Sequence, residues 1–217
     1  MEVKSAYLEQ LQRYIENTIT NSAQLTPDRN ELIGKIADSI VEQLTPDKGL
    51  DLNFICTHNS RRSHFSQVWC QVALMHYGIE NIRTWSGGTE VTQCNPRTAS
   101  ALVRAGFELA NDSSARSDEN PIYQLRFADA KEPIECFSKL YNSPPNPQEN
   151  FFAMLCCSDV DEKCPVISGS TNRFGLHYRD PKYADSTPEE NQAYDSCCQE
   201  IACEMFALSQ RLTESLE

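Results

Sequence analysis

The sequence predicts an α/β protein with a parallel four-stranded sheet, helices on both faces, an N-terminal helical hairpin and a β-hairpin-like insertion. From Leu50 onward, apolar strand-like runs alternate with helical patterns, which is typical of a parallel sheet covered by helices. Two amphipathic helical patterns precede this part, and residues 111–150 interrupt its rhythm. We therefore expect a hairpin over residues 1–48 and one α/β domain over residues 49–217 that contains the insertion.

Residues 5–44 have the periodicity of two amphipathic helices. Thr26 is a suitable N-cap for the second helix and Pro27 suits its first position. A hairpin of this size cannot bury two apolar faces alone, so we expect it to pack on the following domain or, as a homodimer contact, on a second subunit. The apolar stripes are formed by Leu8, Leu11, Ile15 and Ile19, and by Leu32, Ile33, Ile36, Ile40, Val41 and Leu44.

The α/β part contains three strand patterns and three helix patterns. Because right-handed crossovers bring the carboxyl ends of parallel strands to one edge, we expect any site at that edge. The Gly87-Gly88 pair indicates a turn near it. In order, the patterns are a strand at 52–56, a helix at about 63–77, a strand at 82–86, a helix from Asn95-Pro96 to about Ala105, a strand at 151–155 and a terminal helix opened by Thr187-Pro188.

The insertion begins with a polar stretch, and two short apolar segments, 122–127 and 134–137, then have the pattern of a β-hairpin. A proline-rich segment over residues 142–147 leads back to the sheet. The insertion is either a functional element, as a lid or an extra sheet edge, or a structural decoration.

The composition narrows the class of partner. The chain has 217 residues and a formal net charge of −12, which argues against nucleic acid or anionic membranes as partners. No apolar run approaches membrane-spanning length, and Met1-Glu2-Val3-Lys4 lacks the apolar segment of a secretory signal, so we expect a cytoplasmic protein. Its ten cysteines then indicate thiols with redox, catalytic or metal roles. Since no Cys-x-x-Cys pair exists, a zinc site from Cys156, Cys157, Cys164 and His177 is not favoured, and we expect no metal.

The segment after the first strand carries the clearest chemical signal. Cys56 ends the strand, five loop residues follow, and Arg62 and Ser63 open a helix. Amides of such a loop converge on an anion, and the helix dipole favours both the anion and the thiolate form of Cys56. Arg62 can grip two oxygens of a tetrahedral oxyanion, and the Ser63 hydroxyl can hydrogen-bond the Cys56 sulfur. The predicted oxyanion-binding residues are Thr57, His58, Asn59, Ser60, Arg61, Arg62 and Ser63.

Two downstream motifs could complete this chemistry. Cys157 and Cys164 lie seven residues apart in a polar segment that could switch between helix and loop, which suits a thiol relay; the alternative is two unrelated buried thiols. Asp180 precedes Pro181, which holds it in an extended conformation from which it could protonate a departing oxygen.

The Cys56–Ser63 loop, the Asp180-Pro181 pair and the order of elements resemble the low-molecular-weight protein tyrosine phosphatase fold. Within it, the segment from Cys157 to Pro165 is similar to the redox segment of thioredoxin-coupled arsenate reductases. The resemblance covers residues 50–110 and 150–212. It includes neither the N-terminal hairpin nor the insertion.

The reductase resemblance implies that Cys56 attacks arsenate held by the loop and Arg62 while Asp180 acts as the acid. Cys157 then attacks Cys56, and a Cys157–Cys164 disulfide forms for a thioredoxin-type reductant. The phosphatase alternative implies a phosphocysteine at Cys56 that water hydrolyses. Phosphatases of this fold usually carry a second cysteine just before the loop arginine, where this chain has Arg61.

Two positions depart from the family pattern. His58 adds bulk and a titratable group at the second position after the nucleophile. Gln67 stands where the reductases tend to have a glutamate that helps to hold a potassium ion, and we expect no cofactor. A third alternative, a non-catalytic oxyanion-binding or scaffold protein, needs neither Asp180 nor the Cys157/Cys164 pair.

Overall fold

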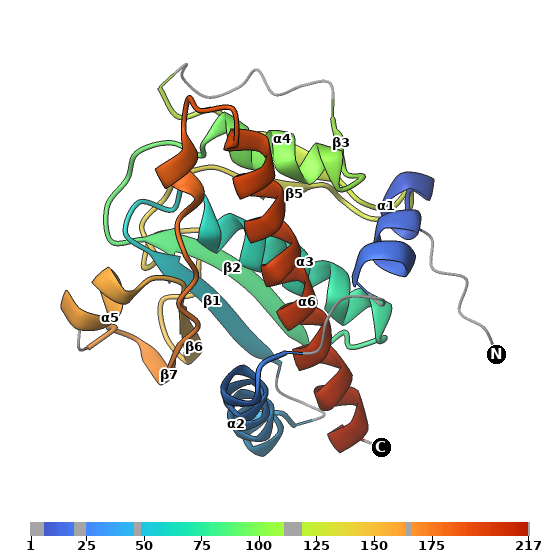
Figure 1. Cartoon of the computed structure of the whole chain (residues 1–217). Coiled ribbons are helices and arrows are strands. Elements are labelled where there is room, and N and C mark those ends of the chain that lie inside the picture. The colour runs from blue at the N-terminus through green and yellow to red at the C-terminus, as the bar shows by residue number, and fades with distance from the viewer. Residues whose placement is uncertain (1–6, 20–24, 46–48, 111–118, 164–165, 217) are drawn as a thin grey trace.

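The computed structural model describes residues 7–19, 25–45, 49–110, 119–163 and 166–216 (Figure 1). Its centre is a four-stranded parallel sheet in the order β2-β1-β6-β7. The predicted parallel sheet is confirmed, including its strands β1 (Leu50–Cys56), β2 (Ile82–Gly88) and β6 (Phe151–Leu155). The fourth strand, β7 (Ser170–Gly175), was not recognised as a strand pattern because it is polar and largely half-exposed at the sheet edge.

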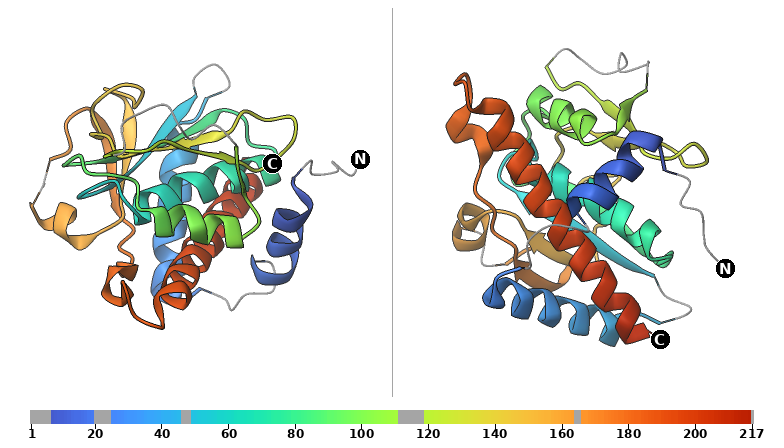
Figure 2. Two further views of the ribbon diagram at one scale, coloured as in Figure 1. Left: turned by 90° about the horizontal axis from the view of Figure 1, so that it is seen from above. Right: turned by 45° about the vertical axis from the view of Figure 1, so that its right-hand side comes forward.

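The helices follow the expected alternation. Helix α3 (Arg62–His76) joins β1 to β2, α4 (Pro96–Arg104) follows β2, and the short α5 (Ser158–Lys163) lies between β6 and β7. A 3₁₀ turn, η2 (Pro181–Ala184), precedes the long terminal helix α6 (Glu190–Leu216). Helices α3 and α6 lie side by side on the same side of the sheet (Figures 1 and 2). The buried Trp69 of α3 packs edge-on against Phe107 and Phe206 in this layer.

The N-terminal helices belong to the same hydrophobic core. Helix α1 (Glu9–Tyr14) continues into a π-helical turn, η1 (Ile15–Ile19), and α2 (Pro27–Gln43) begins where the Thr26 side chain accepts from the amide of Arg29. The two helices lie at different positions around α6 rather than folding back on each other (Figures 1 and 2). Arg29 of α2 forms an ion pair with Glu204 of α6, which fastens α2 to the terminal helix.

The insertion contains the expected hairpin. β4 (Tyr123–Arg126) pairs antiparallel with β5 (Ile134–Cys136), and β3 (Glu108–Leu109) completes a small second sheet. Beyond β5 the chain reaches the outer edge of β2, where the amide of Gly88 donates to the carbonyl of Lys139 at 2.8 Å. The insertion therefore runs along the outer edge of β2 beside the loop after β1, while its hairpin belongs to the separate small sheet.

Gly87 and Gly88 are the last residues of β2 and not a turn, which corrects the sequence prediction. Both positions exclude a side chain. A Cβ atom on Gly87 would lie 2.3 Å from the Cα of Tyr141, and one on Gly88 would lie 2.7 Å from the carbonyl oxygen of Thr57. The glycines therefore let the insertion and the loop approach the sheet closely.

The carboxyl ends of β1, β6 and β7 meet at one edge of the sheet, as expected for parallel strands. β1 ends at Cys56, and β6 leads into Cys156 and Cys157. β7 leads through Tyr178 to Asp180. Among the described residues, no helix is both long enough and apolar enough to cross a membrane.

Candidate active site

The loop from Cys56 to Ser63 is held together by its own side chains. The Asn59 side-chain amide donates to the Ser63 hydroxyl oxygen at 2.9 Å, and that oxygen lies 3.1 Å from the Cys56 sulfur. Since Ser63 accepts from Asn59, its own hydrogen is free to point at the sulfur and stabilise a thiolate. Asn59 has a φ of 45°, a left-handed conformation that asparagine tolerates better than most residues.

Neighbouring segments hold the loop from outside through its carbonyl groups. The amide of Glu90 donates to the Thr57 carbonyl at 2.8 Å, and the amide of Asn95 donates to the Ser60 carbonyl at 3.0 Å. From the insertion, the Ser138 hydroxyl donates to the His58 carbonyl at 2.8 Å. Within the described part of the chain, the amides of residues 57–61 donate to no acceptor. The loop therefore presents donors at the N-terminus of α3, an arrangement that suits an anion.

Arg62 lies across this cradle. Its guanidinium donates to the Tyr178 carbonyl at 3.0 Å and to the Asp180 carboxylate at 2.8 Å. Burial opposes the charged form, but Asp180 and the Cys56 thiol outweigh it and raise the pKa of Arg62. The buried Nε atom has no hydrogen-bond partner among the described residues. A buried guanidinium nitrogen is costly to leave unpaired, and an oxyanion oxygen bound in the cradle would supply the acceptor that this donor lacks.

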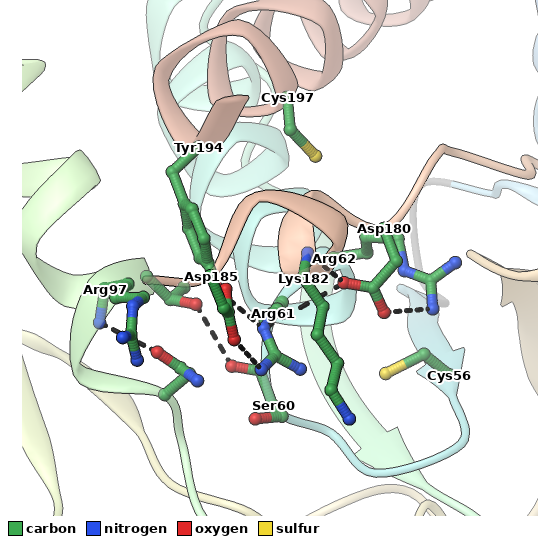
Figure 3. A network of polar contacts seen from close by, with 12 residues as sticks. Cys56, Ser60, Arg61, Arg62, Arg97, Asp180, Lys182, Asp185, Tyr194 and Cys197 are labelled. Carbon is green, nitrogen blue, oxygen red and sulfur yellow. Dashed lines mark hydrogen bonds and ion pairs between the residues drawn. The ribbon is translucent and has the colours of Figure 1, made fainter. Parts of the chain in front are cut away.

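Asp180 closes the cradle at its mouth (Figure 3). Its other oxygen accepts from the amide of Lys182 at 3.0 Å, so the carboxylate caps η2 while it pairs with Arg62. The cavity between Asp180 and the loop measures about 10 Å³, room for about one water molecule. A tetrahedral oxyanion therefore needs the carboxylate to separate from Arg62. The cavity is lined by Cys56, Thr57, His58, Ser60, Arg61, Arg62 and Asp180.

The Arg61 side chain, predicted to bind the oxyanion, is engaged elsewhere. Its guanidinium donates to the Tyr194 hydroxyl at 2.7 Å and to Asp185 at 3.3 Å, and Tyr194 donates to Asp185 at 2.8 Å (Figure 3). These contacts join the loop to η2 and α6. The partners lie more than 120 residues away in the sequence, so no local pattern could have revealed them.

The His58 side chain lies at the rim of the cradle. It is half-exposed, and its Nε2 atom is 3.4 Å from a carboxylate oxygen of Glu90. Like Arg61, His58 therefore leaves the inside of the loop to backbone amides.

The two adjacent cysteines after β6 have different surroundings. The Cys157 sulfur is buried and lies 3.8 Å from the hydroxyl of Thr57, the residue next to Cys56. The Cys156 sulfur lies 3.5 Å from the Ser66 hydroxyl, and burial raises the pKa of Cys156. Of the two sulfurs, that of Cys157 is therefore the one that contacts a side chain of the loop after Cys56. Cys164 lies outside the described residues.

The Asp161 carboxylate ties helix α5, which follows Cys157, to β7 and to His177 beyond it. Asp161 lies 2.7 Å from the Nε2 atom of His177 and 2.5 Å from the guanidinium of Arg173. From the sequence, His177 was considered only as a zinc ligand and this cluster was missed, because ion pairs between neighbouring elements have no sequence signature.

Comparisons with known proteins show which sequences and structures this chain resembles. Over 128 residues the chain is 25% identical to "Arsenate reductase 2" of Staphylococcus epidermidis, covering 59% of this chain and 76% of the relative. Over 141 residues it is 25% identical to an arsenate reductase of Bacillus subtilis, covering 65% and 81%. No family model matches the chain. The solution structure of a low molecular weight protein tyrosine phosphatase from Bacillus subtilis superposes with a TM-score of 0.50 at 12% identity, covering 77% of this chain and all of that one.

The chain therefore has the low-molecular-weight protein tyrosine phosphatase fold, with a cysteine, a five-residue loop and an arginine at the carboxyl end of β1. Within that class its sequence is similar to arsenate reductases, and the resemblance predicted from the sequence is confirmed.

Proposed function

We propose that this protein is an arsenate reductase that uses a Cys56 adduct and a Cys157/Cys164 disulfide relay. The observation that carries the proposal is the position of the Cys157 sulfur, 3.8 Å from the hydroxyl of Thr57, the residue that follows the candidate nucleophile. Hydrolysis of a phosphoester needs no second thiol at this place, whereas reduction of arsenic needs two electrons from a thiol pair. The similarity to arsenate reductases supports the same reading.

The first step forms a bond between sulfur and arsenic. The Cys56 thiolate attacks arsenate held by the loop amides and Arg62, and one oxygen of arsenate leaves as water after Asp180 supplies a proton. The Asp180 carboxylate lies at the mouth of the cradle, and it can act in this way once it has separated from Arg62 and taken up a proton.

The second step reduces arsenic. The Cys157 thiolate attacks the Cys56 sulfur, the sulfur–arsenic bond breaks with its electron pair left on arsenic, and arsenite departs. Two thiols have then been oxidised to a Cys56–Cys157 disulfide while arsenic has gained two electrons. Cys164 attacks Cys157 and frees Cys56, and a thioredoxin-type dithiol reduces the Cys157–Cys164 disulfide.

The partners that follow from this proposal are a small oxyanion and a thioredoxin-type reductant. The cytoplasmic location, dimerisation through the N-terminal helices and a domain boundary at residue 48 remain predictions from the sequence.

The second candidate is a low-molecular-weight phosphatase that hydrolyses phosphoesters through a Cys56 phosphocysteine. The fold favours it, because Cys56, Arg62 and Asp180 would suffice for that reaction. The non-catalytic alternative is disfavoured by Asp180 at the mouth of the cradle, because binding an anion does not by itself need an acid there.

The decisive experiment compares two substrates on one set of variants. Purified wild-type protein is assayed with arsenate plus a thioredoxin system and, separately, with an aryl phosphate. Cys157→Ser and Cys164→Ser should each stop multiple-turnover arsenate reduction but leave phosphate ester hydrolysis largely intact. Cys156→Ser is the matched control, since Cys156 is the adjacent buried thiol, and it should keep reduction.

Mass spectrometry of the arsenate-treated wild type should then detect a Cys157–Cys164 disulfide. Unchanged reduction in both relay variants, or oxidised protein without that bridge, would reject the relay and leave the phosphatase as the better function.

A further inference from the structure

Lys139 is a buried lysine next to the candidate site. It belongs to the insertion, and only 6% of its surface is exposed. Its ammonium lies 4.6 Å from the centre of the Phe137 ring and donates to the Ser86 hydroxyl at 3.5 Å. Burial lowers the pKa of Lys139 to about 8, so near neutral pH the group is mainly a buried cation. Burying an ammonium is costly, so its presence here calls for a role.

The lysine contacts the loop and the sheet at once. Its backbone amide donates to the side-chain oxygen of Asn59 at 3.1 Å, and Asn59 in turn holds Ser63 beside the nucleophile. Its ammonium reaches Ser86 on β2, whose hydroxyl donates to Gln67 at 2.5 Å and lies 3.2 Å from the Nδ1 atom of His64.

The charge of the Lys139 ammonium affects the protonation of a neighbouring histidine. Burial first, and then the Lys139 charge, lower the pKa of His64 to about 3, so the imidazole is neutral at physiological pH. The other titratable groups that interact with Lys139 are Cys94, Cys136 and Glu135. Lys139 is therefore the cation of a cluster that is otherwise neutral apart from Glu135.

A potassium ion of the kind found in the reductases does not fit these residues. The position that would supply its carboxylate is Gln67, and the amide oxygen of Gln67 already accepts from Ser86. A second cation beside Ser86 would be repelled by the Lys139 ammonium.

We propose that the Lys139 ammonium is the resident cation of this site, standing in place of an alkali-metal ion and holding the loop in its anion-binding form. It is a positioning residue: the side chain anchors residue 139 against Ser86 and Phe137, and the backbone amide of that residue holds Asn59. Its charge also adds to the field that favours an anion in the cradle.

The test uses inorganic phosphate as the probe and the full-length protein. The inference rests on the proposed anion-binding role of the loop but not on the reaction that follows, so phosphate binding is measured by calorimetry rather than arsenate turnover. Failure of arsenate reduction with intact phosphate binding would count against the proposed function alone.

Lys139→Met keeps the side-chain length and removes the charge, and Lys139→Arg keeps the charge. We expect Lys139→Met to bind phosphate about tenfold more weakly, as expected for a loss of about 1.4 kcal/mol. We also expect it to shift the pH midpoint of Cys56 alkylation by iodoacetamide upward. Lys139→Arg should recover most of the affinity. Equal phosphate affinity and equal alkylation profiles in folded Lys139→Met and wild type would overturn the proposal.

Exchange of salts tests the same idea without any variant, should Lys139→Met not fold. Phosphate affinity and melting temperature of the wild type should be the same in potassium, sodium and tetramethylammonium chloride at equal ionic strength. A specific gain in potassium would show that the ion still binds and would contradict the inference. A gain in potassium that appears only in Lys139→Met would support it, because removal of the ammonium would then have opened a cation site.

Discussion

The two thiol-bearing segments of the site are held in opposite ways. The Cys56–Ser63 loop is fixed by hydrogen bonds from α4's N-cap, the insertion and its own Asn59. The segment after Cys157 is a helix of six residues. Asp161 of this helix pairs with Arg173 of β7 and with His177, just beyond β7. Anion binding gains from donors that are already in place, whereas transfer of a disulfide needs a sulfur that travels.

The spacing of the relay thiols makes this contrast quantitative. A regular helix over seven residues separates its ends by about 10 Å. A disulfide requires α-carbons within about 7 Å of each other. A segment that was helical from Cys157 to Cys164 would therefore have to unwind at least partly before the two sulfurs could join, and α5 accounts for six residues of that segment.

The largest effect on turnover should come from substitutions in the Cys56–Ser63 loop, which we call the rigid region. Cys56→Ser should abolish both arsenate reduction and aryl phosphate hydrolysis, because the hydroxyl is a far weaker nucleophile than the thiolate. Arg62→Lys should lower both by about 10² or more, because a point charge cannot reproduce a planar two-pronged donor. Steady-state kinetics check this, with Cys203→Ser on α6 as the control thiol and circular dichroism to verify folding. Substantial turnover by Cys56→Ser would remove it as the nucleophile.

Asp180→Asn tests the group that spans the mouth of the rigid region. Turnover should fall by about 10² to 10⁴, the usual range for a lost acid catalyst. Phosphate binding should be kept or tightened, because the Arg62–Asp180 pair at 2.8 Å no longer competes with the anion. Kinetics and calorimetry measure the two effects separately. The matched control is Asp195→Asn on α6, which removes the ion-pair partner of Arg104 on α4. Wild-type rates in Asp180→Asn would assign the proton to another group.

Asp161→Asn tests the attachment of helix α5, the segment that follows Cys157. Loss of the ion pairs to Arg173 and His177 should loosen α5 and change the rate of Cys157–Cys164 disulfide formation a few-fold, in the faster direction. Hydrolysis of an aryl phosphate should not change. Rapid-quench mass spectrometry follows the disulfide, and Glu162→Gln, an exposed neighbour on the same helix, serves as the comparison. A slower disulfide in Asp161→Asn would mean that the helical form is the one that reacts.

The smallest effect on turnover concerns acid stability of the rigid region. Burial lowers the pKa of His64 to about 3, against 6.5 for an ordinary histidine. Since the folded pKa is the lower one, the unfolded chain binds the extra proton first, and His64 makes stability fall as the pH drops from about 6.5 towards 3. The slope approaches about 1.4 kcal/mol per pH unit. Chemical denaturation of His64→Gln should show a shallower loss over this range, and identical slopes would contradict the assignment.

Much of the fold followed from local patterns. The N-caps Thr26 and Asn95 with their prolines marked the helix starts, and the fully apolar run at Phe151 marked a buried strand. Strand β7 was not predicted, because an edge strand of largely polar, half-exposed residues has no apolar pattern to recognise.

The sequence by itself determined the candidate nucleophile, the arginine and the order of β1, α3, β2, α4, β6 and α6, because these depend on residues close together in the chain. Only the tertiary structure decided that Arg61 turns to Tyr194 and Asp185, that the Cys157 sulfur lies near the Thr57 hydroxyl, and that Lys139 lies buried next to Ser86. Each of these contacts joins residues more than fifty positions apart. Such contacts depend on how whole elements pack, and packing leaves no spacing rule in the chain.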